Sequence, residues 1–202
     1  TGNRDSIKQL LLNDRQDTNR VINLANLGYE YIDTKPDTLM ILALQALSLA
    51  NHIGFEKGKA ISLNRVGNAF SSLGNYPKAM EVYLQALQIN EKINNLDGKQ
   101  RNINNIGNIY RLEEDYRQSL GYLFKAKFLA EQVNNNNQIL STTLVNIAIN
   151  YDSLKIYDSA ILYAQQSYDV ADKINYSRTL GTSLQQLGHI HFMRNENTLA
   201  LE

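Results

Sequence analysis

The stretch "INNIGNIYRLEEDYRQSLGYLFKAK", residues 103–127, carries three asparagines among isoleucines, a glycine and a tyrosine in its first eight positions. Asparagine is a mediocre helix former because its side chain competes for backbone hydrogen bonds. Three of them in a segment with helical spacing therefore need a structural reason or a ligand. Whether the pattern recurs along the chain decides between a structural reason and a ligand.

The same template returns about every 40 residues, as "LNRVGNAFSSLGNYPKAMEVYLQAL" in 63–87 and "LVNIAINYDSLKIYDSAILYAQQSY" in 144–168. A small residue recurs at steps of 39, 40, 41 and 40, at Gly28, Gly67, Gly107, Ala148 and Gly188. Four places before each stands an apolar residue: Leu24, Leu63, Ile103, Leu144 and Leu184. Three places after it stand Tyr31, Phe70, Tyr110, Tyr151 and His191. These spacings predict one face of a helix in every copy.

A second series with steps of three and four follows each first helix. It contains Tyr76, Ala79, Tyr83 and Ala86, then Tyr116, Ser119, Leu123 and Ala126, then Tyr157, Ala160, Ala164 and Ser167. We expect a helical hairpin in every unit, with turns at 34–37, 73–77, 113–116 and 154–158. Asn75 and Asp115 are predicted N-caps, and Pro77 is tolerated in a first turn. Polar connectors are predicted at 51–58, 93–98, 133–138 and 173–178.

This pattern resembles the tetratricopeptide repeat (TPR), whose small residue, aromatic residue and later Ala, aromatic, Ala are matched by Gly67, Phe70, Ala79, Tyr83 and Ala86. The usual TPR period is roughly 34 residues. The longer period here is similar to that of kinesin light chains, Pins-type adaptors and bacterial TPR sensor regions. The resemblance extends from about Asp17 to Glu202 and implies a protein-binding fold without fixing the site.

The resemblance implies an all-α fold, a right-handed superhelical solenoid of antiparallel hairpins without strands. We expect one domain over 1–202, with a capping helix in 1–15, full repeats at 16–53, 54–95, 96–136 and 137–176, and a partial fifth repeat at 177–202. Within 1–15, residues 5–14 read as a short amphipathic helix. Since terminal units need a polar cap, we expect the native protein to continue past Glu202 or another chain to cover this end.

Composition excludes several classes of function. Lys and Arg together number 20, as do Asp and Glu, so no net charge favours nucleic acid or an anionic membrane. The absence of cysteine excludes disulfides and thiolate metal sites. No apolar run is long enough to span a bilayer. Because the chain begins without a leader, either a start was removed or it is a fragment. Its location is open, cytoplasmic or, after loss of a signal peptide, periplasmic.

Catalytic and metal sites find little support in the sequence. The segment "GFEKGKAI" fails as a phosphate loop because Ile53 and Ala60 occupy the required glycine and hydroxyl positions. The carboxylates in 113–115 fit a solvated turn. His189 and His191 are about 200° apart on a helix and cannot share a metal, and His191 takes the aromatic packing position. Most of the tyrosines occupy repeat-packing positions without interleaved Lys or Arg, which favours core or inter-helix packing over stacking on nucleic-acid bases. We predict no enzyme activity, cofactor or metal.

Asparagines cluster around the template's small residue in the middle units. In TPR solenoids the first helices line a concave groove, and an amide offers a donor and an acceptor as a peptide backbone does. The alternative is that these amides bond between adjacent first helices or face water. The predicted groove residues are Asn64, Arg65, Asn68, Arg101, Asn104, Asn105, Asn108, Arg111, Val145, Asn146, Ile149 and His189.

The predicted ligand is a peptide or protein segment with an acidic and a hydrophobic part, because the groove residues are partly basic and partly apolar. Asparagines would orient it and the variable positions would anchor it. The carboxylate-clamp subtype of TPR is not matched, since Thr142 and Asn146 occupy the positions of its later basic pair. The ligand's identity is open.

Three functions remain open at this stage. The first is a non-enzymatic interaction module that binds a segment in its groove. The second is the sensory region of a larger bacterial signalling protein, such as a histidine kinase, cyclase or transcription regulator, with its output domain elsewhere. The third is a scaffold that self-associates through a terminal or convex face, including an uncapped C-terminal end.

Overall fold

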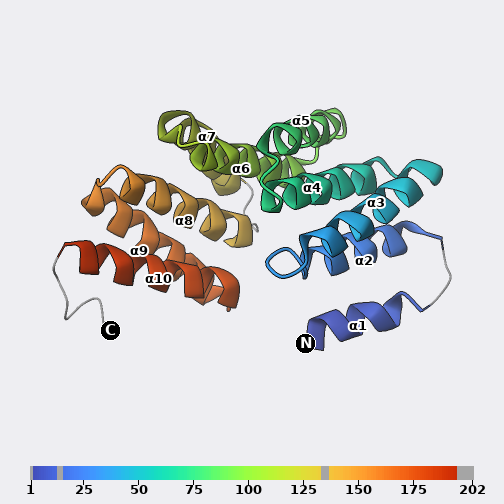
Figure 1. Cartoon of the computed structure of the whole chain (residues 1–202), viewed down its shortest axis with the longest axis horizontal. Coiled ribbons are helices and arrows are strands. Elements are labelled where there is room, and N and C mark those ends of the chain that lie inside the picture. The colour runs from blue at the N-terminus through green and yellow to red at the C-terminus, as the bar shows by residue number, and fades with distance from the viewer. Residues whose placement is uncertain (1, 13–15, 133–136, 195–202) are drawn as a thin grey trace. The chain divides into compact units, whose positions relative to one another are not determined.

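The computed structural model describes residues 2–12, 16–132 and 137–194, and every regular element in those ranges is an α-helix. The predicted all-α fold of antiparallel hairpins is confirmed (Figure 1). The helices are α1 (Gly2–Leu10), α2 (Thr18–Tyr29), α3 (Pro36–His52), α4 (Glu56–Ser72), α5 (Tyr76–Lys92), α6 (Leu96–Leu112), α7 (Tyr116–Gln132), α8 (Asn137–Ser153), α9 (Tyr157–Lys173) and α10 (Ser177–Met193).

The chain forms two compact units, Thr1–Asn105 and Ile106–Glu202, called unit 1 and unit 2 below. In unit 1, α2 packs on α3 and α4, and α4 packs on α5. In unit 2, α8 packs on α7, α9 and α10. Each of the pairs α2–α3, α4–α5, α6–α7 and α8–α9 lies inside one predicted repeat, and the division of the chain into those repeats stays a prediction.

One residue with positive φ follows most helices, and it returns at a regular interval along the chain. Gly54, Gly74, Asn94 and Glu114 form one evenly spaced series, and Lys155 and Asn175 form another with the same spacing. The residue after it donates its backbone N–H to a carbonyl five residues earlier, as Asp115 does to Tyr110 over 2.9 Å. This bonding closes the helix as a Schellman motif does.

Two of the residues that follow a positive-φ residue, Asn75 and Asp115, also start the next helix. The side chain of Asn75 accepts from the backbone N–H of Lys78 over 3.3 Å, and that of Asp115 accepts from Gln118 over 3.0 Å. The predicted N-caps are therefore confirmed. Pro77 lies in the first turn of α5, as expected. A single residue closes one helix with its backbone and opens the next with its side chain.

The template positions form the cores of the hairpins. The last three positions of the second-helix series are buried, as Ala79, Tyr83 and Ala86 are in α5, whereas its leading tyrosine is only partly buried in each copy. The small residue of the first helix lets that series approach, since a Cβ added to Gly67 would overlap the Tyr83 ring. In unit 2 the Leu123 side chain takes the place of Tyr83 and faces Gly107. Close approach is the reason for glycine at these positions.

Tyrosines join first helices to second helices in unit 2. Tyr110 stacks on Tyr122 with ring centroids 5.3 Å apart, and Tyr151 stacks on Tyr163 at 5.6 Å. The predicted inter-helix packing of these aromatics is confirmed. Phe70 in unit 1 is only partly buried, and the Lys78 ammonium lies over its ring. The deeply buried aromatic of that hairpin is Tyr83 instead, at 2% exposure.

The predicted terminal elements are described in part. The expected helix in 5–14 is α1, which begins and ends earlier, at Gly2 and Leu10, and packs on α2. Arg4 of α1 donates to the carbonyl of Glu30 over 2.9 Å, and its guanidinium lies over the Tyr31 ring. The predicted connector residues 133–136 and residues 195–202 of the predicted partial fifth repeat lie outside the described residues. Among the described helices, none is long and apolar enough to cross a membrane.

Candidate functional site

The predicted amide residues lie on first helices, but several of them bond to the protein itself. Asn68 of α4 is buried, and its Oδ1 accepts the Tyr83 hydroxyl over 2.8 Å and the Asn105 amide over 3.1 Å. Asn105 belongs to α6, so this bond joins two adjacent first helices. The alternative of inter-helix bonding is correct for this pair. Asn104 is also buried.

Tyr83 shows how tightly this junction excludes water. Burial raises the pKa of its hydroxyl well above the ordinary value, and the nearby Arg65 guanidinium offsets only part of that rise. A buried hydroxyl needs a partner, and Asn68 supplies it. The Asn68 amide is therefore a structural acceptor in the core of unit 1.

In unit 2 the predicted groove residues differ in accessibility. Asn108 and Arg111 are partly exposed at the end of α6, and Arg111 donates to the Asn108 oxygen over 2.9 Å. Val145 of α8 is buried at 4% exposure, whereas Asn146 and Ile149 of the same helix are partly exposed. A valine that packs in the core offers no surface to a ligand, and periodicity alone did not show this.

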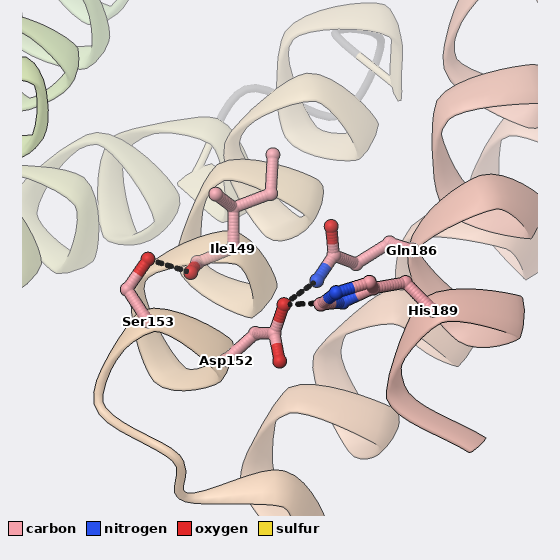
Figure 2. A network of polar contacts seen from close by, with 5 residues as sticks. All are labelled: Ile149, Asp152, Ser153, Gln186 and His189. Carbon is pink, nitrogen blue, oxygen red and sulfur yellow. Dashed lines mark hydrogen bonds and ion pairs between the residues drawn. The ribbon is translucent and has the colours of Figure 1, made fainter. Parts of the chain in front are cut away.

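A network of polar contacts joins α8 to α10 in unit 2. Figure 2 shows Gln186 and His189 of α10 converging on Asp152 of α8, whose Oδ2 lies 2.7 Å from Gln186 Nε2 and 2.9 Å from His189 Nδ1. Ser153 turns instead to the carbonyl of Ile149 in its own helix, over 3.0 Å. The contacts of Asp152 with Gln186 and His189 therefore tie the first helices α8 and α10 together.

Unit 1 contains a cavity of about 160 Å³ between its first helices and the end of α5. Three predicted groove residues, Asn64, Arg65 and Arg101, line it. Its other lining residues are Asn26, Ala60, Ile61, Asn90, Gly98 and Asn102. The Arg65 guanidinium lies 4.1 Å from the centre of the Tyr29 ring, and Arg101 is exposed. The lining therefore carries two cations and no acidic side chain.

Three asparagines, called the amide relay below, run from the start of α6 to this cavity. Asn95 Oδ1 accepts from the backbone N–H of Gly98 over 3.4 Å, and Asn95 Nδ2 donates to Asn90 Oδ1 over 2.7 Å. Asn90 Nδ2 then donates to Asn102 Oδ1 over 2.7 Å. A backbone N–H can only donate, so it fixes the orientation of every amide that follows.

The relay ends in a donor without a partner. Asn102 is fully buried, and its Nδ2 has no hydrogen-bond partner in the described structure. The same holds for Nδ2 of Asn64, a residue 6% exposed. Buried polar groups are nearly always paired, so two unpaired amide donors on one cavity mark a place that an acceptor would complete.

Sequence reasoning missed Asn90 and Asn102, although the repeat held a signal for both. At the position of Asn90 the other hairpins have Ala50, Ala130 and Ala171. At the position of Asn102 they have Ser62, Thr143 and Ser183, and the first two of these hydroxyls bond a carbonyl of their own helix. A paired departure from the template, from alanine to asparagine at the end of one repeat and from hydroxyl to amide at the start of the next, distinguishes this junction between repeats.

The described residues include no group of three or more His, Cys, Asp or Glu side chains that could hold a metal ion. His189 contacts Asp152 and lies in the α8–α10 network. His191 is partly buried. The candidate site is therefore the cavity of unit 1, which offers hydrogen-bond donors and positive charge.

Comparison with known proteins agrees with the fold. Residues 60–98 match the family model "Tetratricopeptide repeat". This segment begins at Ala60 in α4 and ends at Gly98 in α6, so it covers the hairpin and connector that carry most of the cavity. No curated protein sequence is similar enough to this chain to count as a match.

Solved structures with the same fold share little sequence with this chain. A Rap protein complexed with Competence and Sporulation Factor is 17% identical with a TM-score of 0.83, and the match covers 98% of this chain and 55% of that one. A putative kinesin light chain from Podosopora anserina is 13% identical, with a TM-score of 0.63 over 90% of both chains.

A third structure is a Signal Transduction ATPase with Numerous Domains, with a tetratricopeptide repeat sensor, from Pyrococcus horikoshii. It is 15% identical with a TM-score of 0.65, and the match covers 85% of this chain and 27% of that one. The chain thus spans little more than half of the Rap protein and about a quarter of the ATPase. At these identities the likeness concerns the fold, which is that of TPR proteins.

Proposed function

We propose that this chain is a non-enzymatic interaction module that binds a peptide or protein segment on the surface of its first helices. The observation that carries the proposal is the cavity of unit 1, where two buried amide donors without partners lie beside two arginines. Peptides present carbonyl and carboxylate oxygens, which are the acceptors that such a lining would pair. The TPR-type fold, typical of protein-interaction modules, supports this proposal.

The size of the cavity favours one side chain of a longer ligand. Small-molecule sites usually have volumes of roughly 300 to 1,000 Å³, and this cavity has about 160 Å³. The rest of the ligand would lie on the neighbouring exposed surface, including Arg101. Unit 2 carries its own set of candidate contact residues, each partly or fully exposed: Asn108, Arg111, Asn146, Ile149 and His189.

Energetics assign different roles to the amides and the arginines. A neutral hydrogen bond contributes about 0.5 to 1.5 kcal/mol, and one to a charged group about 1.5 to 3 kcal/mol. Micromolar binding requires about 8 kcal/mol. The arginines and apolar contacts would therefore supply most of the affinity, and the amides would fix orientation.

Selection from a displayed library of random peptides tests this function. We expect enriched peptides to bind with micromolar affinity by calorimetry and Arg101→Gln to weaken that binding about tenfold, which is about 1.4 kcal/mol. The matched control is Arg117→Gln, which removes an exposed arginine from the second helix α7. Failure to enrich any peptide, or equal losses in both variants, would contradict binding on the first helices.

A second candidate is the sensory region of a larger signalling protein. The likeness to the TPR sensor of the Pyrococcus horikoshii ATPase supports it, as does the Rap protein complexed with Competence and Sporulation Factor. Both candidates use the same binding surface. The sequence of the complete gene distinguishes them, because a sensory region requires an output domain in the same chain and a free adaptor does not.

A further inference from the structure

We infer that the cavity of unit 1 selects a side-chain carboxylate of the ligand, and that the N-cap of α6 sets this preference through the amide relay. The inference rests on the proposed function and names the ligand chemistry at one site. It requires that the unpaired buried polar atoms of the cavity lining be donors, that these donors be held in place, and that the amide relay be absent from the other junctions between repeats.

The orientation of the relay supplies the first requirement. Gly98 N–H must donate to Asn95, so Asn95 must donate to Asn90, and Asn90 must donate to Asn102. The atom left over is Asn102 Nδ2, a donor. Asn64 Nδ2 adds a second unpaired donor, and Arg65 and Arg101 add positive charge. A group that only accepts hydrogen bonds and carries negative charge pairs both amide donors and is attracted by both guanidinium groups.

Burial supplies the second requirement. Asn90 is 2% exposed and Asn102 is fully buried, so neither amide can rotate freely in solvent. A flip of Asn102 would bring its amino group against the amino group of Asn90, and a flip of Asn90 would leave Asn95 and Asn90 with two facing amino groups. The relay thus has one favourable orientation, which the cap of α6 determines.

Comparison with the other junctions between repeats supplies the third requirement, that the relay be absent from them. Ala50 with Ser62, Ala130 with Thr143 and Ala171 with Ser183 occupy the corresponding places. Ser167 of α9 bonds Ser183 of α10 and the carbonyl of Ser141 in α8, so the hydroxyls at this junction are paired within the protein. A relay of three asparagines that leaves a donor unpaired occurs at one junction between repeats in the described part of the chain.

The sharpest test reverses the direction of the hydrogen bonds along the amide relay. Asn95→Asp keeps the N-cap of α6, because aspartate caps helices as well as asparagine. A carboxylate cannot donate, so Asn90 must flip to donate to it, and Asn102 must then donate to Asn90. The atom presented to the cavity becomes Asn102 Oδ1, an acceptor, and the site should lose its preference for carboxylate.

Two controls isolate this effect. Asn75→Asp makes the same change at the N-cap of α5, which has no relay behind it. Asn94→Asp adds the same charge one residue from Asn95, at an exposed position with positive φ that aspartate tolerates. A further variant, Asn90→Ala with Asn102→Ser, gives this junction the residue types found at the other junctions between repeats. It removes the relay within a pattern that the chain already folds.

The probes are N-acetylglutamate amide, its neutral isostere N-acetylglutamine amide, N-acetylalanine and inorganic phosphate, each titrated at millimolar concentration into the whole chain. The readout is the NMR shift of the asparagine side-chain amides. We expect N-acetylglutamate amide to move the Asn64 and Asn102 signals and to bind about tenfold more tightly than the glutamine isostere. Asn95→Asp should abolish this preference, Asn75→Asp and Asn94→Asp should retain most of it, and the Asn90→Ala, Asn102→Ser variant should lose it.

Each other outcome overturns the inference. Equal binding of the two isosteres would show that the cavity does not select carboxylate, and equal losses in Asn94→Asp and Asn95→Asp would assign the effect to charge alone. Tighter binding of phosphate or of N-acetylalanine would assign the site to a free anion or a chain terminus. The titration needs no peptide partner, so it can succeed or fail independently of the proposed function, which fails when displayed peptides do not bind the first helices.

Discussion

Asn68 and Tyr83 form a buried pair in which the tyrosine hydroxyl donates to the amide oxygen over 2.8 Å, and the same oxygen accepts from Asn105 of the next first helix. One side chain therefore closes a hairpin internally and joins it to its neighbour. The pair explains one asparagine of the repeated template as a packing element. It also makes the stability of unit 1 dependent on a titratable hydroxyl.

Alkaline pH should destabilise the chain in part through Tyr83. Its pKa is raised in the folded state, so the unfolded chain ionises first, near pH 10. The contribution of Tyr83 is complete below that pH, and above it stability falls by up to about 1.4 kcal/mol per pH unit. Urea denaturation across this range should show a shallower decline for Tyr83→Phe. Tyr116→Phe is the control, and an equal change in slope for both variants would refute the assignment.

Glycine should be required at Gly67 and dispensable at Gly121. A Cβ at Gly67 overlaps the Tyr83 ring, so Gly67→Ala should cost about 1 to 3 kcal/mol of stability through overpacking. Gly121 is exposed in α7 with no neighbouring atom near an added Cβ, so Gly121→Ala should stabilise by up to about 1 kcal/mol. Thermal denaturation measures both. The same sign for the two variants would contradict the packing described here.

Much of this fold follows from sequence periodicity, because the helix repeat and the small residues act through local and adjacent contacts. Gly67 and Tyr83 were predictable as template positions for that reason. The amide relay was not, because its bonds depend on how the end of α5 meets the start of α6. Asn90 still differed visibly from Ala50 and Ala130, so comparison among repeats could have marked it. Burial of Val145 likewise depends on neighbouring helices.

Replacing Lys155 with glycine should stabilise unit 2. Lys155 has φ of 59°, and a non-glycine residue in this left-handed region costs roughly 1 to 2 kcal/mol. The greater flexibility of glycine in the unfolded chain offsets part of that gain, which leaves about 0.5 to 1 kcal/mol. Lys155→Ala is the control. It removes the long side chain but keeps a Cβ in the left-handed region, so it should not stabilise the protein. Differential scanning calorimetry would reveal a raised Tm for the glycine variant only.

Replacing Gln100 with leucine should stabilise unit 1. It is fully buried in α6, and neither atom of its amide has a hydrogen-bond partner in the described structure. Gln100→Leu removes two unpaired polar atoms from the core at similar volume, so stability should rise by about 1 to 3 kcal/mol. Gln118→Leu, on the exposed surface of α7, provides the comparison. A lower stability for Gln100→Leu would mean that the amide has a partner, such as a ligand or water.

The positive-φ turn residues have a consequence for how the chain can change in length. From Gly54 to Glu114 they are evenly spaced, and each follows a helix of the same length. A deletion or duplication of one whole hairpin that begins at one of these turns joins matching turn geometries and preserves the alternation of first and second helices. Loss or gain of a single helix with its turn would exchange the two kinds of helix and bring the amide-bearing faces against the alanine-lined ones. Such an array can gain or lose whole hairpins by recombination while its surfaces stay in phase.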